Sequence, residues 1–457
     1  MTKRIRLFVI LITLIAGNST EISAQLISGP MLGYAEQQEV CIWLEAGPAS
    51  RELAIRYWPV SEKEKVSEAR RLLTNTGSNQ PVHIVLSGLQ QATGYEYAVY
   101  LDGKQQQAER PLRFRTRQTW AKWSKPKPLD FSFLIGSCVY LNDSAYDRPA
   151  ASPYGQDPSI LQTMAKTPAD FMIWTGDNLY YREADWTSRS GIYRRNSVSR
   201  SNGFMQELLS VRPNYAIWDD HDYGPNDANS SFELKHITRE AFIQYWANKT
   251  YGENNQGIYS KFSVQDAEFF LLDDRWFRDA NQKPDSINGK PNPEKQYLGE
   301  QQLKWLKNAL ISSEYPFKFI INGNQVTNGM ADKECMSHFP ADYLDLMQFI
   351  QANKINGVVF ISGDRHFTEL LKTDRDKSYP LYEYTSSPIS SGPFKKITES
   401  PEAGNPLRVA GSLYADNNFG RISLSGSGKE RNILIETLDR NGKIVFSYTI
   451  SATEIGN

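Results

Sequence analysis

The pattern of hydrophobic and polar positions divides the chain into two parts of different character. Between about residues 27 and 117, short runs such as 53–58 and 82–86 alternate apolar with polar residues. A period of two is typical of strands with one buried face, and several short strands in succession predict a β-sandwich. Strands are expected at 40–44, 53–58, 82–86, 94–100 and 112–116. We therefore predict an all-β sandwich domain over residues 25–120.

The pattern changes after a polar segment with two prolines, 125–128, which indicates a linker. Beyond it, apolar strands alternate with helical stretches, which is the signature of a layered α/β domain. Strands are expected at 131–135, 171–174, 215–218, 269–272, 317–321 and 358–361, and helices at 234–247, 300–310 and 343–352. Residues 432–450 predict two strands around the turn sequence Asp439-Arg440-Asn441-Gly442. This second domain is predicted to span residues 128–455.

Length and composition agree with two ordinary globular domains. The chain has 457 residues, of which 40% are hydrophobic and 23% charged, so extensive disorder is excluded. The net charge of −1 gives no basic footprint for nucleic acid. No apolar stretch after the N-terminus is long enough to cross a bilayer. We expect no specific nucleic-acid partner and no membrane span in the mature chain, while the charge balance says little about a small anionic substrate.

The N-terminus carries a targeting signal. Basic residues at positions 3, 4 and 6 precede an apolar run over 7–16, and small residues lead to Ala24-Gln25. This order of basic region, short apolar region and cleavage site predicts a signal peptide over residues 1–24 and a periplasmic or secreted protein. The alternative is a retained N-terminal anchor. The chain has only three cysteines, Cys41, Cys138 and Cys335, which is too few for a disulfide framework. Because the number is odd, at least one thiol is free or ligated.

Residues that bind metals follow four of the predicted strands. The clusters are Gly136-Ser137-Cys138, Gly176-Asp177 with Tyr180, Asp219-Asp220-His221-Asp222 and Gly363-Asp364-Arg365-His366. Taken alone, Asp177 could be a turn residue, Cys138 a small buried hydrophobe, and Asp364 with His366 a surface ion pair. A run of three carboxylates and an imidazole, however, repels itself unless it is solvated or neutralised by a cation. Because active sites in layered sheets lie at the carboxyl ends of strands, the four clusters together predict one metal site.

These clusters carry a family resemblance. Together with Leu272-Asp273, Arg275 and Gly323-Asn324-Gln325-Val326, they resemble the PhoD-type alkaline phosphatases, a branch of the calcineurin-like metallophosphoesterases, over about residues 130–450. The resemblance implies a catalytic α/β/β/α sandwich that holds iron (Fe³⁺) with calcium (Ca²⁺) nearby, although other divalent metals would also suit oxygen-rich ligands. The N-terminal sandwich matches the family's arrangement, and residues 89–97 resemble a corner of fibronectin type III domains.

The resemblance also implies a role for individual residues. The metal ligands it implies are Cys138, Asp177, Tyr180, Asp220, Asp364 and His366. Cys138 and Tyr180 would supply a thiolate and a phenolate, which suit a trivalent ion, and His366 would complete the iron shell. Asp177 would bridge the metals. Tyr140, two residues after Cys138, could belong to the cluster or support it from behind.

The remaining implied roles concern the second metal and the substrate. Asp220 and Asp364 match positions that bind the second metal, and His221 matches a residue that protonates the leaving group or stabilises the transition state. The candidates to hold substrate phosphate are Arg275, Arg182 and Arg365, and the first has the best motif support. For each arginine a structural ion pair is the alternative.

The resulting hypothesis is an exported alkaline phosphatase D-like hydrolase of phosphate monoesters, diesters or both. A water or hydroxide that the metals activate would attack phosphorus in line with the leaving group. The alternatives are an enzyme that is mainly a phosphodiesterase, or a non-catalytic exported binding protein. Two departures from the family pattern stand out. Asp222 replaces the usual glutamate after Asp-Asp-His, and 223–227 differs from the expected asparagine-rich run, although Asn226 could still reach a metal.

Overall fold

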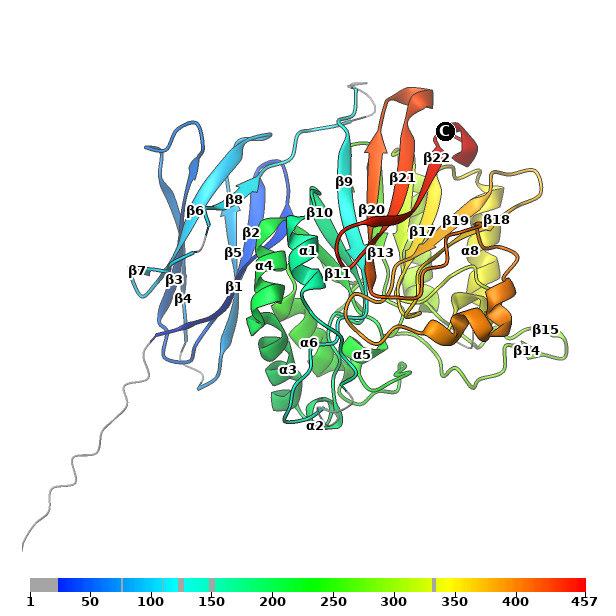
Figure 1. Ribbon diagram of the computed structural model, residues 1–457, viewed down its shortest axis with the longest axis horizontal. Helices are drawn as coiled ribbons and strands as arrows, with labels where there is room; N and C mark the ends of the chain where they lie inside the picture. The colour runs from blue at the N-terminus through cyan, green and yellow to red at the C-terminus, as the bar shows by residue number, and fades with distance from the viewer. Residues whose placement is uncertain (1–23, 75–76, 109, 122–126, 148–152, 331–333) are drawn as a thin grey trace, which may run out of the picture.

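The computed structural model describes residues 24–457 except 75–76, 109, 122–126, 148–152 and 331–333 (Figure 1). The predicted signal peptide therefore lies outside the described residues, apart from Ala24. Among the described residues, no helix is long and apolar enough to cross a membrane.

The N-terminal part consists of two β-sheets that enclose a core of their own. One sheet has the order β1-β2-β5, with β1 (Leu26–Ala35), β2 (Glu39–Ala46) and β5 (Gln80–Ser87). The other contains β3 (Glu52–Pro59), β4 (Ser67–Leu72), β6 (Gly94–Leu101), β7 (Lys104–Gln105) and β8 (Leu112–Arg115). Alternate residues of both sheets, such as Ile42, Leu44, Ile55 and Val99, are buried between them. The β-sandwich predicted from alternation is present, while its likeness to fibronectin type III stays a prediction.

The larger part is built on two six-stranded sheets. The first has the order β11-β10-β9-β20-β21-β22 and the second the order β12-β13-β16-β17-β19-β18. The first comprises β9 (Phe131–Gly136), β10 (Phe171–Thr175), β11 (Asn214–Ile217), β20 (Asn418–Ser425), β21 (Asn432–Asp439) and β22 (Ile444–Ser451). The second comprises β12 (Ser260–Val264), β13 (Ala267–Leu271), β16 (Phe317–Ile321), β17 (Val358–Ser362), β18 (Glu369–Thr373) and β19 (Leu381–Thr385). A separate hairpin joins β14 (Ser286–Ile287) to β15 (Lys290–Pro291).

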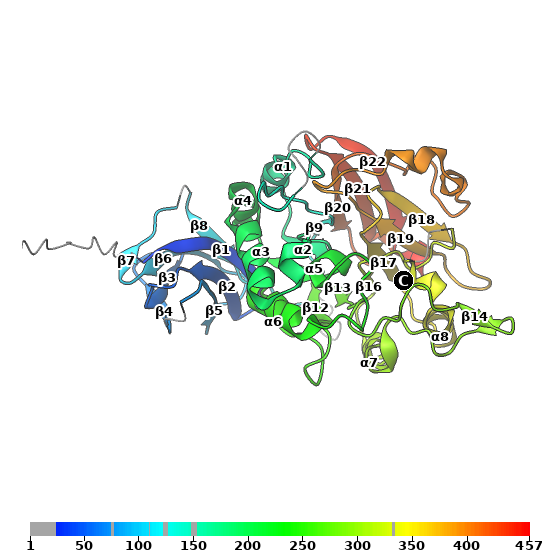
Figure 2. The same ribbon diagram turned by 90° about the horizontal axis from the view of Figure 1, so that it is seen from below.

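Helices cover the outer faces of these sheets. The helices are α1 (Ile160–Lys166), α2 (Glu183–Trp186), α3 (Arg189–Ser201), α4 (Gly203–Val211), α5 (Asp220–Tyr223), α6 (Lys235–Tyr245), α7 (Gly299–Ser312) and α8 (Pro340–Ala352). Leu303 of α7 and Leu346 of α8 pack with Phe360 on the second sheet, while α1 and α4 lie beside the first sheet (Figures 1 and 2). The layers are therefore α/β/β/α, as the resemblance implied.

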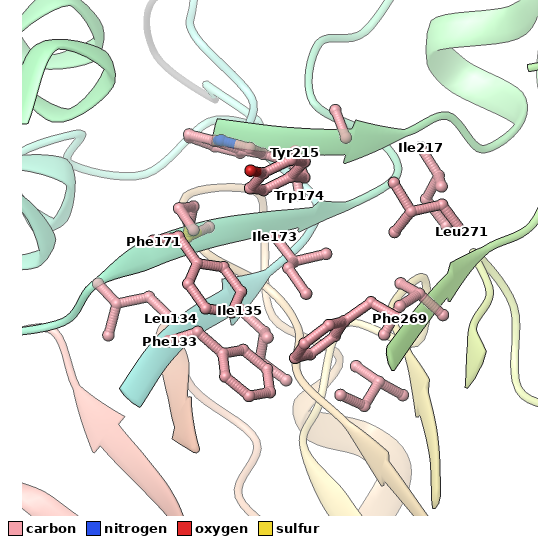
Figure 3. Packing of buried hydrophobic residues seen from close by; sticks show 14 of the residues in the cluster. Phe133, Leu134, Ile135, Phe171, Ile173, Trp174, Tyr215, Ile217, Phe269 and Leu271 are labelled. Atoms are coloured by element: carbon pink, nitrogen blue, oxygen red, sulfur yellow. The ribbon is translucent and has the colours of Figure 1, made fainter. Parts of the chain in front are cut away.

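The core between the two sheets is aromatic (Figure 3). The ring of Phe133 on β9 stacks on that of Phe171 at 5.1 Å between centroids, and it meets Phe269 and Phe319 of the opposite sheet edge-on at 5.2 and 5.5 Å. Such offset and edge-on pairs add to the free energy gained from burial alone. This rigid layer holds the strands of both sheets in register, and the candidate site lies where those strands end.

Candidate metal centre

The loops that carry the predicted ligands all leave the same edge of the molecule. Strands β9, β10 and β11 are parallel, and so are β13, β16, β17 and β19. Their carboxyl ends therefore point the same way in each sheet. Backbone hydrogen bonds tie the loops together, from Val139 N to Asp177 O (2.8 Å), from Tyr181 N to His221 O (3.0 Å) and from Gly363 N to Gly323 O (2.7 Å). These bonds join neighbouring loops, and the Cys138 thiol, 3.6 Å from the carbonyl oxygen of Asp364, links segments 226 residues apart in sequence.

The backbone at four predicted ligands is left-handed. Cys138, Asp177, Asp364 and His366 have φ values of 60°, 52°, 67° and 57°. Residues other than glycine rarely adopt this conformation, and they concentrate at functional sites when the surrounding structure enforces it. Each of these residues comes one or a few positions after a strand, where the turn redirects its side chain toward the centre.

Two glycines allow the loops to approach. A Cβ atom at Gly323 would lie 2.4 Å from Asp274 Oδ2, and one at Gly363 would lie 2.6 Å from the Ser137 side chain. A larger residue at Gly323 would push apart the loops after β16 and β13, and one at Gly363 those after β17 and β9. The sequence motifs therefore contain glycine for steric reasons.

The first group of donors is built around Cys138. Ligand atoms of Cys138, Asp177 and His366 lie within 4.8 Å of one another. The Cys138 thiol lies 3.6 Å from Asp177 Oδ2, and the Tyr180 hydroxyl lies 3.2 Å from His366 Nε2. The structure thus brings together the four residues that the resemblance assigned to iron.

His366 is held in one orientation from behind. Its Nδ1 lies 2.6 Å from the carbonyl oxygen of Gly392 and 3.2 Å from the hydroxyl of Tyr154. A proton on Nδ1 that is donated to the Gly392 carbonyl leaves Nε2 unprotonated, so that its lone pair, which faces the Tyr180 hydroxyl here, is the one that would bind a metal. The hydroxyl of Tyr140 donates to Asp147 at 3.0 Å and its ring packs against that of Tyr180, which favours a supporting role.

Two further donor groups extend from the first. Asp177, Asp220 and His221 form one group, and Asp220, Asp227 and Glu334 form the next, each with ligand atoms within 4.8 Å. Because Asp177 belongs to the first two groups and Asp220 to the last two, the three groups make a continuous line of cation positions. Asp364 is outside these three groups.

The Asp219–Asp222 run splits into two faces. Asp220 and His221 face the donor groups, and the His221 ring lies 4.2 Å from that of Tyr180. Asp222 points inward and accepts hydrogen bonds from the backbone N–H groups of Asp177 (3.2 Å) and Asp219 (2.6 Å). Asp222 therefore fixes the loop that carries Asp177. This structural role accounts for the carboxylate at position 222, which does not need to bind a metal.

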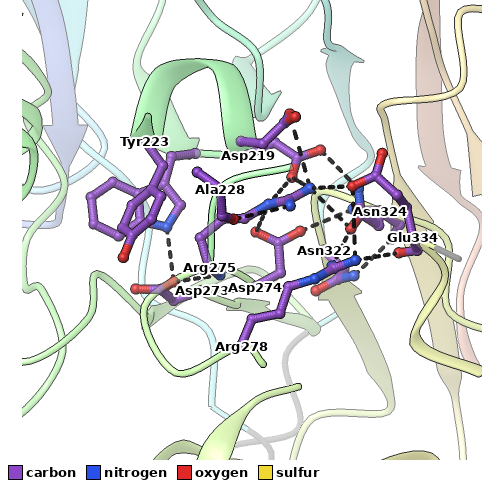
Figure 4. Close-up of polar contacts among 12 residues, drawn as sticks. Asp219, Tyr223, Ala228, Asp273, Asp274, Arg275, Arg278, Asn322, Asn324 and Glu334 are labelled. Atoms are coloured by element: carbon purple, nitrogen blue, oxygen red, sulfur yellow. Dashed lines mark hydrogen bonds and ion pairs between the residues drawn. The ribbon is translucent and has the colours of Figure 1, made fainter. Parts of the chain in front are cut away.

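Arg275 is fully buried and engaged by neighbours (Figure 4). Its Nε donates to Asp219 Oδ1 at 2.6 Å, and its Nη2 donates to Asn324 Oδ1 at 3.1 Å and to Glu334 Oε1 at 3.3 Å. This geometry favours the structural ion pair that was the alternative to phosphate binding. The other two candidates are also paired, Arg182 with Asp147 and Arg365 with Glu402.

The charge balance of the centre calls for cations. Burial and the neighbouring Asp220 and Cys138 raise the pKa of Asp177 well above its usual value. Burial, then Glu334, raises the pKa values of Asp227 and Asp364 to about 7. Nearby arginines, Arg275 beside both and Arg365 beside Asp364, offset these shifts only in part, and bound multivalent ions would supply further positive charge. The thiolate, phenolate and imidazole side suits a trivalent or borderline metal, whereas the carboxylate side suits a hard cation.

Cation binding is expected to weaken as the pH falls below about 7. In the metal-free folded chain the carboxyls of Asp227 and Asp364 have pKa values of about 7, so they stay protonated up to that pH. In the unfolded chain they lose their protons at about pH 4. Their contribution to metal-free stability is therefore present in acid and lost as the pH rises through 7. Metals bind the ionised form, so each displaced proton weakens binding by up to about tenfold per pH unit below 7.

The measurement is the rise in unfolding temperature that Ca²⁺ causes in the chelator-treated protein at pH 5.5 and at pH 8. We expect a clearly larger rise at pH 8. An equal rise at both values would show that these carboxyls do not take part in binding.

Sequence reasoning missed two members of the centre. Asp227 follows Asp220 by seven residues in the same loop, and its backbone N–H donates to Asp220 Oδ2 at 2.7 Å. The sequence predicted a possible metal contact for Asn226 beside it. Glu334 lies outside every recognised motif, and only the fold brings it to Asp220. A search for acidic residues along that loop could have found Asp227, but no sequence signal points to Glu334.

Comparisons with known proteins agree with this architecture. The sequence profile of a family described as PhoD-like phosphatase matches residues 154–430, and that of a domain of unknown function matches residues 23–119. Alkaline phosphatase D of Bacillus subtilis (strain 168) is 24% identical over 395 residues, which cover 73% of this chain and 63% of the relative. The alignment thus spans less than two thirds of that relative's length.

Solved structures share the fold. A structure of PhoD matches with a TM-score of 0.73 and 17% identity, covering 92% of each chain. The purple acid phosphatase PPD1 from yellow lupin (Lupinus luteus) seeds matches with a TM-score of 0.62 and 12% identity, covering 92% of this chain and 74% of the other. Both likenesses extend over the sandwich as well as the layered domain, since each covers nearly the whole chain.

Proposed function

We propose, from the premise that this chain belongs to the family of PhoD-like phosphatases, that it hydrolyses phosphate esters at this metal centre. The observation that carries the proposal is the line of three donor groups that share Asp177 and Asp220 at one sheet edge. Adjacent cation positions can hold both the attacking and the leaving oxygen of a displacement at phosphorus. Monoesters, diesters or both are within this chemistry.

The residues of the chain perform distinct tasks in this proposal. Bound metals would polarise the phosphoryl oxygens and lower the pKa of the attacking water. Asp177 and Asp220 would each supply carboxylate oxygens to two adjacent donor groups, and the hydrogen bond to the Gly392 carbonyl oxygen orients the His366 ring. His221 is partly buried against the ring of Tyr180, where its imidazole can donate a proton to the departing oxygen. The mechanism requires no serine or threonine nucleophile.

Rates on a phosphate monoester and on a matched diester, before and after chelator treatment, test the function. We expect hydrolysis of at least one of them that chelation abolishes and added metal restores. Absence of hydrolysis on both by metal-loaded protein would favour the binding-protein alternative. A rate on the diester alone would identify a phosphodiesterase.

Cys138→Ala is expected to lose the metal of the first group, which we propose to be Fe³⁺, and activity with it. Burial and the nearby Asp364 raise the pKa of the Cys138 thiol to about 11, so the metal-free thiol is protonated and a cation must displace that proton. Even a supporting partner of a ligand is worth about 10–100-fold in metal affinity, so loss of the ligand is expected to exceed that. Metal analysis and the visible phenolate–iron absorption give the readout.

Cys335→Ala is the matched control, because Cys335 is another buried free thiol outside the donor groups. It should retain metal and colour. Unchanged iron content in Cys138→Ala would make that thiol a packing residue. Ca²⁺ at the carboxylate side is proposed on the same grounds and is read from the same analysis.

We further propose that the protein is exported to the periplasm or beyond, on the basis of the basic and apolar segments of residues 1–24. The mature chain is expected to begin near Gln25, one residue before β1 starts at Leu26. N-terminal sequencing of the exported protein checks this. An intact N-terminus on exported material would indicate the retained anchor.

A further inference from the structure

A large cleft lies between the N-terminal sandwich and the layered domain, away from the metal ligands. Its volume is about 1320 Å³, and it is lined by the β4–β5 region on one side and by α3 and the end of α6 on the other. Pockets for drug-sized molecules have volumes of roughly 300–1,000 Å³. The cleft is therefore large enough for an extended ligand of several linked rings.

The two walls of the cleft are fixed relative to each other. Asn79 Nδ2 donates to Ser197 Oγ across the domain boundary at 3.1 Å, and Trp43 Nε1 donates to the carbonyl oxygen of Gln244 at 2.8 Å. Behind the wall, the fully buried Glu45 accepts hydrogen bonds from Ser197 (3.0 Å) and Tyr245 (2.7 Å). A preformed cleft loses less conformational entropy when a ligand binds than one that must close.

The lining is rich in neutral hydrogen-bonding groups. Hydroxyl and amide side chains come from both walls, and they include Asn79, Gln80, Ser188, Ser190, Ser197 and Gln244. The Nε2 atom of Gln80 is buried and has no hydrogen-bond partner among the described residues. Hydroxyl and amide groups can donate and accept, which matches a ligand that carries many hydroxyl groups.

The charged part of the lining is positive. Arg71, Arg189 and Arg194 line the cleft, whereas no aspartate or glutamate is among the described residues that do. Arg189 donates to Glu240 at 2.8 Å and Arg194 to Asp143 at 2.9 Å, and neither acid is part of the lining. Arg71 is exposed. Guanidinium groups bind carboxylates, sulfates and phosphates, and because acids already pair with Arg189 and Arg194, the attraction for an anion comes from Arg71.

Apolar side chains share the lining with polar ones, and most of them are aliphatic. Leu72 is 77% exposed, and the side chain of Tyr193 is also part of the lining, while Tyr245 is almost completely buried. Proteins that bind single-stranded nucleic acids present several aromatic rings in a strongly basic groove. The chain as a whole carries a net charge of −1, which does not favour that class.

We propose that this interdomain cleft binds an anionic oligosaccharide. The hydroxyl groups of the sugar bond to the serine and amide side chains, its acidic groups face Arg71, and its rings pack against Leu72 and Tyr193. The cleft would keep a sugar polymer on the same molecule as the metal centre. Binding does not require hydrolysis, so it can be tested separately from the proposed function.

The experiment titrates the full-length mature protein with short oligomannuronate, phosphorylated oligomannose, neutral isomaltose oligomers and oligothymidylate. We expect the anionic sugars to bind more tightly than the neutral ones and more weakly as salt is raised. The two anionic sugars separate carboxylate from phosphate as the source of charge. Arg71→Ser is expected to weaken their binding by about fivefold or more.

Ser190→Trp, which fills the cleft without a change of charge, is expected to abolish binding. Arg56→Ser is the charge-matched control, because Arg56 is exposed on the same domain, pairs with Glu68 and does not line the cleft. Ester hydrolysis should be the same in all three variants, which also shows that they fold. Equal binding by Ser190→Trp, equal binding of neutral sugars, or tighter binding of oligothymidylate would each overturn the proposal.

Discussion

Asp177→Asn is expected to lower the rate of ester hydrolysis by about 10⁴-fold or more and to release metal from two positions at once. Asp177 is shared by the Cys138 group and the Asp220 group, so one substitution weakens both. Metal ions supply several kcal/mol of transition-state stabilisation, and about 5.4 kcal/mol corresponds to 10⁴ in rate. Asparagine keeps the shape of the side chain but removes the charge, so lost packing would not explain the effect.

Two measurements separate this effect from misfolding. The control is Asp170→Asn, which should keep both metal content and rate. Asp170 is an exposed carboxylate on the same domain, and it accepts a hydrogen bond from Ser132 N at 2.8 Å. The metal-free Asp177→Asn protein should unfold at the same temperature as the metal-free wild type or higher, because a buried uncompensated acid has been removed. If the variant kept both metals, Asp177 would have to be a structural residue.

His221→Ala is expected to lower kcat by about 10²–10⁴, the usual range for general acid catalysis. The loss should be smaller for a nitrophenyl ester than for an alkyl ester, because a good leaving group needs less protonation. Metal content should stay near that of the wild type. Metal analysis and kcat values for the two esters provide the readout.

His221 also belongs geometrically to the second donor group, so the opposite outcome has a clear meaning. Loss of metal in His221→Ala would identify the imidazole as a ligand. Equal losses on both esters with intact metal would identify it as an electrostatic contact to the transition state. His236→Ala is a useful control, since that imidazole packs edge-on against Trp276 outside the donor groups and should not affect either ester.

Most of the strand framework could be predicted because its strands are short apolar runs bounded by turn residues. β1 was missed because Gly29-Pro30 interrupts its pattern and its pairing with β2 contains register shifts. β20 was missed although it is central in its sheet, between β9 and β21. A Cβ atom at Gly420 in this strand would lie 2.7 Å from Ile135 and from Tyr384, so close packing requires glycine there. The glycine interrupts the apolar run by which a buried strand is recognised in a sequence.

The centre was predictable where ligands follow strands and unpredictable where they come from long loops. Cys138, Asp177 and His366 each follow a parallel strand, so sheet topology alone brings them together. Glu334 reaches the centre from the long segment between β16 and α8, and no periodicity marks it. Phosphate binding by Arg275 was predicted from its motif, which does not show the partners of the side chain. Its ion pair with the buried Asp219 favours a structural role instead.

The left-handed backbone at the ligands sets a limit on how this protein can be stabilised. Strained conformations of this kind cost on the order of 1–3 kcal/mol each and persist because the fold enforces them. Glycine at Asp177 would relieve the strain and the buried charge together, and so would yield a more stable protein without the carboxylate that two donor groups share. Selection for thermal stability alone would therefore favour substitutions at these positions first. A screen for more stable variants must also measure activity if the ligands are to be retained.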